Sequence, residues 1–230
     1  MTVTLLAVAA ALAVGDWAAV QFPDAQIPWR LFGRVRELRV GALEYLLKPG
    51  ALAVLLAAAC VADLGGAKYW VVAALAFGLA GDVGLMLSEE GRTDLPFLAG
   101  LGAFLAGHVC YVVAFARTGL RGWDVFAGVL VVAGVAGLAL PQVLRGAARA
   151  SGRLFAGIIA GYATLLAAMA VLGIGTGIVA TAIGAVLFLC SDTLLARNRF
   201  VAPVRSGPLL VIVTYHAAQF LILIGLLYRS

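Results

Sequence analysis

The sequence predicts an all-α membrane protein, a bundle of about eight transmembrane helices that forms a single domain over residues 1–230. Two features of the composition predict this class, because 64% of the residues are hydrophobic and only 12% are charged. Soluble domains have about 45–50% apolar and about 25% charged residues. The third observation is that apolar stretches of about 20 residues, enough to cross a bilayer core of about 30 Å, recur along the whole chain.

Eight stretches meet this length, and the short connections between them make consecutive helices antiparallel. They are Val3–Gln21, Leu43–Val61, Tyr69–Leu87, Leu95–Ala116, Trp123–Leu144, Leu154–Gly173, Gly175–Ala196 and Pro208–Tyr228. The connection 22–42 is the longest, and we expect Trp29–Arg34 in it to lie along the lipid interface as a short amphipathic piece. Gly157 and Gly161 form a GxxxG pair, which predicts a close helix contact.

The basic residues predict the orientation in the membrane. The connections after the odd-numbered spans hold eleven arginines, whereas the opposite side holds four basic residues. The positive-inside rule therefore places the odd connections in the cytoplasm and both termini outside. This explanation of the net charge of +5 leaves no reason to expect a nucleic-acid partner. The preference for arginine over lysine and the richness in alanine and glycine favour a GC-rich genome, and hence a bacterial inner membrane.

Charged side chains inside a span cost at least about 2.5–3.5 kcal/mol at mid-helix, so each needs an explanation. The spans contain Asp16, Glu44, Lys48, Asp82, His108, Asp192 and His216, accompanied by Tyr111, Tyr162, Tyr215 and Gln219. The alternating direction of the helices places the acidic residues and Lys48 at similar depth, near the cytoplasmic side. The histidines and Gln219 come nearer the middle of the membrane. The expected site is a polar pocket open to the cytoplasmic leaflet and floored by histidines and a glutamine.

Asp82 and Asp192 are the candidate catalytic residues, because neither has a basic residue one helical turn away. Two carboxyls that share a dry site can hold one group as a protonated acid and the other as an ionised base. Other polar residues have plainer explanations: Asp16 beside Trp17 as an interfacial residue, and Glu44 with Lys48 as a local i,i+4 ion pair. The histidines are also compatible with a hydrogen-bonded core. We expect no metal site, since the histidines lie too deep relative to the aspartates, and the three cysteines read as buried thiols.

An ordered set of motifs on the second to eighth spans resembles the YhhN/TMEM86 family of membrane proteins, the lysoplasmalogenases. The matching stretches are Lys48–Pro49, Phe77–Leu87, Phe97–Tyr111, Tyr162, Gly184–Asp192 and Tyr215–Gln219. Each stretch is short, but their order and spacing together are specific. The sequence departs from the expected family pattern at His216, where a second tyrosine is expected beside Tyr215.

The resemblance implies hydrolysis of the vinyl-ether bond of lysoplasmalogens, which releases a fatty aldehyde and a glycerophospho-ethanolamine or -choline. It implies that Asp82 and Asp192 carry out the reaction without a metal or cofactor, with a lysophospholipid in the bilayer as substrate. Lys48 would hold the lipid phosphate at the cytoplasmic rim. His108, Tyr111, Tyr162, Tyr215 and Gln219 would orient the carboxyls and the glycerol part, and His216 and Glu44 are further supporting candidates.

A small proton-coupled transporter is the alternative, because paired intramembrane carboxylates also serve as proton relays. Gly81-Asp82 in the third span and Ser191-Asp192 in the seventh are faintly parallel, and internal repeats are typical of carriers. The sequence does not determine the oligomeric state, the lipid headgroup or which aspartate is the acid.

Overall fold

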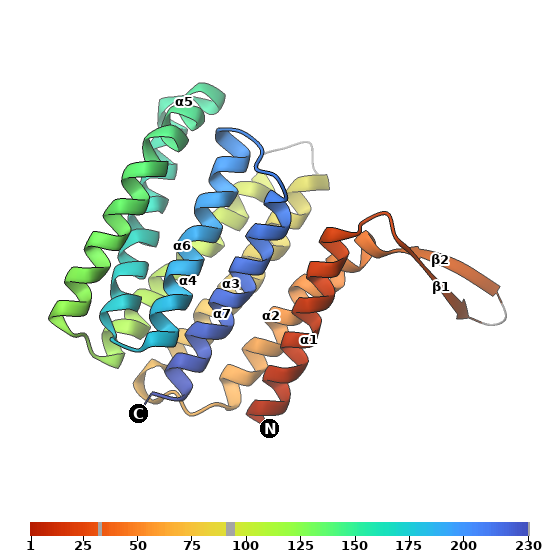
Figure 1. Ribbon diagram of the computed structural model, residues 1–230, viewed down its shortest axis with the longest axis horizontal. Helices are drawn as coiled ribbons and strands as arrows, with labels where there is room; N and C mark the ends of the chain where they lie inside the picture. Colours follow the sequence, from red (N-terminus) through yellow and green to blue (C-terminus); the bar gives the residue numbers. More distant parts are fainter. Residues whose placement is uncertain (32–33, 91–94, 230) are drawn as a thin grey trace.

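The computed structural model describes residues 1–31, 34–90 and 95–229, and gives side chains for residues 1–26, 42–88 and 95–229. The described chain is a bundle of long helices with one small hairpin beside it (Figure 1). The helices are α1 (Thr2–Gln21), α2 (Glu44–Val61), α3 (Lys68–Glu90), α4 (Leu95–Thr118), α5 (Gly122–Gly175), α6 (Val179–Phe200) and α7 (Gly207–Leu227). The all-α membrane class is thereby confirmed.

The expected number of eight helices was wrong, because the described residues form seven helices that are long and apolar enough to cross a membrane. The expected fifth and sixth spans both lie in α5, which has 54 residues. We expected residues 145–153 to be a connection because they carry three arginines, but residues 145–151 continue the first part of the helix. Their alanines favour helix, and arginine is also a good helix former.

Gly152 divides α5 into two arms, residues 122–151 and 153–175, since its backbone has φ 87° and ψ 172°. A residue with a side chain would be strained at this positive φ, and glycine is not. Figure 1 shows that α5 reverses direction, so that both chain termini lie at the same end of the bundle. The side of the membrane on which they lie remains a prediction.

The connection after α1 contains a two-stranded antiparallel hairpin, β1 (Gln26–Leu31) and β2 (Arg34–Arg39), which the sequence analysis did not predict. The hairpin projects away from the helices in Figure 1. The amphipathic run that we expected at Trp29–Arg34 includes residues 32–33, which lie outside the described residues.

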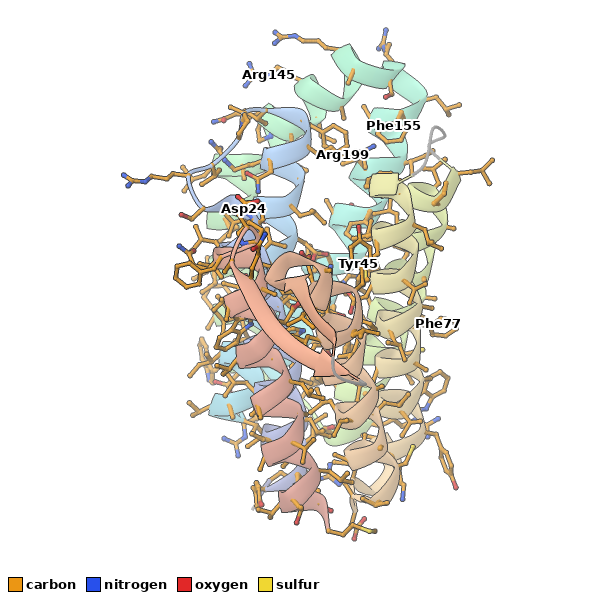
Figure 2. All side chains as sticks on the ribbon, turned by 90° about the vertical axis from the view of Figure 1, so that its right-hand side faces the viewer. Asp24, Tyr45, Phe77, Arg145, Phe155 and Arg199 are labelled. Carbon is orange, nitrogen blue, oxygen red and sulfur yellow. The ribbon has the colours of Figure 1, made fainter. Side chains whose placement is uncertain are left out.

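Close packing in the bundle depends on glycine where α3 crosses α4. A Cβ atom added to Gly84 would lie 2.7 Å from the Cα atom of Gly100. The GxxxG pair of α5 behaves differently, because a Cβ at Gly157 or Gly161 would meet nothing within 4 Å, so the close contact expected there was wrong. The outer surface is apolar, as expected against lipid, and Phe77 projects from it in Figure 2.

Candidate active site

A cavity of about 620 Å³ lies inside the bundle, and each of the helices α1 to α7 contributes to its lining. Most of its lining is apolar, and both arms of α5 contribute alanine and leucine to it. Six of the residues singled out from the sequence line this cavity: Glu44, Lys48, Asp82, Tyr162, Asp192 and Tyr215. The structure therefore places the two aspartates on one cavity, which is what their similar depth along the spans had led us to expect.

Asp82 on α3 lies beside a cation and a hydroxyl donor. Its Oδ1 is 3.7 Å from the Nζ of Lys48 on α2, and its Oδ2 accepts a hydrogen bond of 3.1 Å from the hydroxyl of Tyr215 on α7. The Asp82 side chain is only 2% exposed and that of Lys48 16%. A buried carboxylate needs such partners, because an uncompensated charge in this environment is costly.

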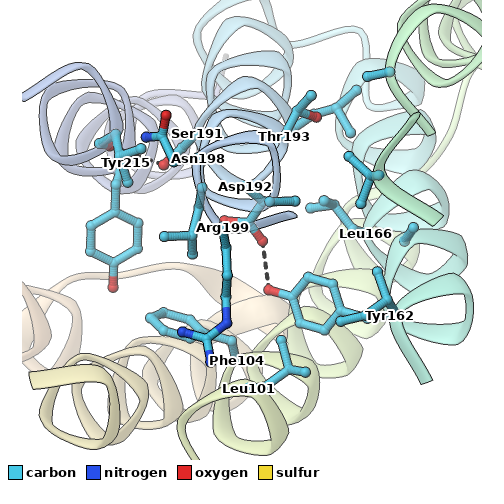
Figure 3. Close-up of a pocket in the computed structure, with 18 of the residues that line it drawn as sticks. Leu101, Phe104, Tyr162, Leu166, Ser191, Asp192, Thr193, Asn198, Arg199 and Tyr215 are labelled. Carbon is cyan, nitrogen blue, oxygen red and sulfur yellow. Dashed lines mark hydrogen bonds between the residues drawn. The ribbon is translucent and has the colours of Figure 1, made fainter. Parts of the chain in front are cut away.

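Asp192 on α6 has neutral aromatic neighbours. The hydroxyl of Tyr162, on the second arm of α5, donates a hydrogen bond of 2.5 Å to its Oδ2, as Figure 3 shows. The Nε2 of His108 on α4 lies 3.8 Å from the same oxygen, beyond hydrogen-bond distance. At 12% exposure, the Asp192 side chain is more open than that of Asp82.

The remaining predicted residues do not line the cavity, so the expected floor of histidines and a glutamine was wrong. Tyr111 donates a hydrogen bond to Oε1 of Gln219, and Gln219 interacts with the hydroxyl of Tyr215. Both therefore support Asp82 from behind, through Tyr215. His216 faces another side of α7 than its neighbour Tyr215, and its Nδ1 accepts a hydrogen bond of 3.2 Å from Trp17.

Asp16 on α1 is fully buried rather than interfacial, which corrects the sequence-based interpretation. Within the described part of the chain, neither of its carboxyl oxygens has a hydrogen-bond partner. It interacts electrostatically with Glu44, Lys48 and Asp82. The hydrogen bond from the adjacent Trp17 to His216 joins α1 to α7.

Arg199, on the last turn of α6, also lines the cavity, although the sequence analysis counted it only among the loop charges. Its guanidinium carbon lies 3.7 Å from the centroid of the Phe97 ring on α4. A spacing of seven residues places it on nearly the same face of α6 as Asp192, since seven residues make almost two helical turns. This spacing is the signal that would have identified Arg199 from the sequence.

The arrangement suits acid–base chemistry. The lysine beside Asp82 favours an ionised carboxylate there, while the phenol beside Asp192 can donate to either form of that carboxyl. Among the described residues, no three His, Cys, Asp or Glu side chains form a group that could hold a metal ion. Metal independence remains a prediction.

Comparison with known proteins identifies the family. The model of the YhhN family matches residues 43–226. The chain is also 33% identical over 222 residues to the lysoplasmalogenase TMEM86B of Sus scrofa, a match that covers 92% of this chain and 86% of the pig protein. No solved structure matches the chain. The match with the family model covers most of the chain, so this protein belongs to the YhhN family and is homologous to a lysoplasmalogenase, an ether-bond hydrolase.

Proposed function

We propose that this protein hydrolyses the vinyl-ether bond of lysoplasmalogens, with Asp192 as the general acid and Asp82 as the carboxylate that activates water. The observation that carries the proposal is the pair of carboxyls on one apolar cavity, of which only Asp82 has a cation within 4 Å in the described structure. Homology to a lysoplasmalogenase supports the substrate class.

A vinyl ether is broken by protonation of carbon. Asp192 donates its proton to the alkenyl carbon that is not bonded to oxygen, and positive charge develops on the carbon that is. The Asp82 carboxylate stabilises this charge and takes a proton from the attacking water. In the resulting hemiacetal, the bond between the former alkenyl carbon and the glycerol oxygen breaks, the glycerol oxygen takes the proton of the hemiacetal hydroxyl, and the fatty aldehyde leaves. The proton gained by Asp82 returns to Asp192 before the next turnover.

The surrounding residues hold the two carboxyls in position. Tyr162 and Tyr215 each donate to one aspartate, so that one oxygen of each carboxyl is held by the protein. Lys48 neutralises Asp82, so its ammonium group is less available for the phosphate contact that the sequence predicted. The alkenyl chain would lie against the alanine- and leucine-rich walls from α5, because burial of hydrocarbon there is favourable.

The test is a matched series of lysophospholipids with one chain length and one headgroup. Purified protein in detergent is given the vinyl ether, the saturated alkyl ether and the acyl ester, and fatty aldehyde is measured. Aldehyde is expected only from the vinyl ether, since the alkyl ether has no double bond to protonate. A chelator is expected to leave the rate unchanged.

Failure of folded wild-type protein to release aldehyde from both ethanolamine and choline vinyl ethers would contradict the proposal. The carboxyl pair would then be examined as the proton relay of a carrier.

A further inference from the structure

We infer that Arg199 binds the phosphate of the lipid substrate at the mouth of the cavity. The inference rests on the proposed function for the identity of the lipid, but the anion site itself follows from the position of this guanidinium. The sequence had given the phosphate to Lys48, whose ammonium faces Asp82 instead.

The position of Arg199 fits the layout of the substrate. Arg199 is exposed, whereas Asp82 and Asp192 lie deeper, so it marks the open end of the cavity. It lies about 10 Å further along α6 than Asp192, at the rise of 1.5 Å per residue, and faces nearly the same way. In a lysoplasmalogen, the three glycerol carbons separate the vinyl ether from the phosphate. A substrate with its ether oxygen at Asp192 would therefore extend its phosphate toward Arg199.

The contact with Phe97 positions the Arg199 guanidinium at the mouth of the cavity. Arg199 reaches from α6 to α4, where its guanidinium carbon lies over the Phe97 ring. Stacking on the Phe97 ring uses the flat face of the guanidinium, whereas the N–H donors of an arginine lie in the plane of the group. Two parallel N–H donors match two phosphate oxygens, which a lysine ammonium cannot reproduce.

Arg197 provides a matched control two residues away. Its Nη1 donates a hydrogen bond of 3.1 Å to Oε1 of Gln142, and it does not line the cavity. The two arginines share a helix turn and a charge, but only Arg199 faces the cavity. A general effect of positive charge at this end of the bundle would be the same for both.

The experiment compares a substrate with phosphate and one without it. Aldehyde release is measured with the lysoplasmalogen and with the corresponding alkenyl glycerol, for wild type and the variants Arg199→Gln, Arg199→Lys, Arg197→Gln and Lys48→Gln. Loss of charge-assisted hydrogen bonds is expected to raise KM for the phosphate-bearing substrate about tenfold or more in Arg199→Gln. KM for the alkenyl glycerol should not change. For the phosphate-bearing substrate, KM of Arg199→Lys should lie between those of wild type and Arg199→Gln, and KM of Arg197→Gln should match that of wild type.

A binding measurement separates this inference from the reaction itself. An acyl lysophosphatidylethanolamine and a monoacylglycerol with the same chain are bound to wild type and Arg199→Gln, and tryptophan fluorescence is followed. Arg199→Gln should weaken binding of the phospholipid alone. Inorganic phosphate should compete only weakly, because it lacks the chain. This result would support the phosphate site even if no vinyl ether is cleaved.

Three outcomes would overturn the inference. Equal losses on both lipids would show a structural role for Arg199, and no loss on either would show no role. A phosphate-dependent loss in Lys48→Gln but not in Arg199→Gln would return the phosphate to the lysine.

Discussion

Asp82 and Asp192 line the same cavity but have different kinds of neighbour. Asp82 has the Lys48 ammonium and the Tyr215 hydroxyl on its two oxygens, whereas the described neighbours of Asp192 are the phenol of Tyr162 and the His108 ring. A cation favours the ionised form of a carboxyl, so the two aspartates are suited to different halves of one reaction. From this difference we infer which aspartate is the acid and which is the base, an assignment that the sequence left open.

The largest expected effect follows from removing either carboxyl. Asp82→Asn and Asp192→Asn keep the shape of the side chain but can neither accept nor donate the transferred proton. Each should lower kcat for aldehyde release by about 10²–10⁴-fold, the contribution typical of positioned acid–base groups.

The control for both variants is Asp16→Asn, which changes a buried carboxyl that does not line the cavity. It should keep far more activity than either of them. Near wild-type turnover in folded Asp82→Asn or Asp192→Asn would show that the pair does not carry out the reaction.

Removal of the hydroxyl of Tyr162 or of Tyr215 tests the difference between the two aspartates through smaller losses of activity. Tyr162→Phe removes the 2.5 Å hydrogen bond of Asp192, and we expect kcat to fall about 100-fold, at the lower end of losses for single catalytic hydrogen-bond donors. Tyr215→Phe should cost only about tenfold, because Lys48 still neutralises Asp82. Steady-state kinetics on both variants measures the ratio. A larger loss in Tyr215→Phe would mean that the lysine contributes less than its position suggests.

The smallest expected effect concerns packing rather than chemistry. The helix of Asp82 meets α4 at Gly84 and Gly100, whereas Gly157 in the second arm of α5 faces open space. Gly84→Ala should destabilise the fold by about 1–3 kcal/mol, since its Cβ would meet backbone atoms that cannot move aside. Gly157→Ala should leave stability unchanged or raise it by up to about 1 kcal/mol, because alanine favours helix.

Thermal unfolding in detergent measures both variants. Equal unfolding temperatures would contradict the difference in packing between these two parts of the bundle.

Much of the fold could be predicted because membrane spans are set by length and hydrophobicity. Residues 145–153 were misassigned because their arginines are typical of a connection, although only the backbone of Gly152 breaks the helix. The hairpin of β1 and β2 was missed because strand pairing depends on contacts between segments. The close helix contact predicted at Gly157 and Gly161 was wrong because GxxxG spacing does not determine whether a neighbouring helix packs against that face.

The depth of the site residues along their helices could be predicted, but the directions in which their side chains face could not. Counting residues along antiparallel spans placed Asp82, Asp192 and Lys48 at one level, and all three line the cavity. The rotation of each helix about its axis depends on packing, so the sequence did not show that Tyr215 faces Asp82 while His216 faces Trp17. For the same reason the burial of Asp16 was missed.

The most direct test of the central assignment is infrared spectroscopy of the carboxyl groups in the resting protein at neutral pH. A protonated carboxyl has a C=O stretching band that an ionised carboxylate lacks. Asp16 is also buried without a described hydrogen-bond partner, so its carboxyl can give a band of its own, which Asp16→Asn identifies. Apart from that band, we expect wild type to show one that is lost in Asp192→Asn and retained in Asp82→Asn. Loss of the band in Asp82→Asn with its retention in Asp192→Asn would contradict the account and exchange the roles of the two aspartates.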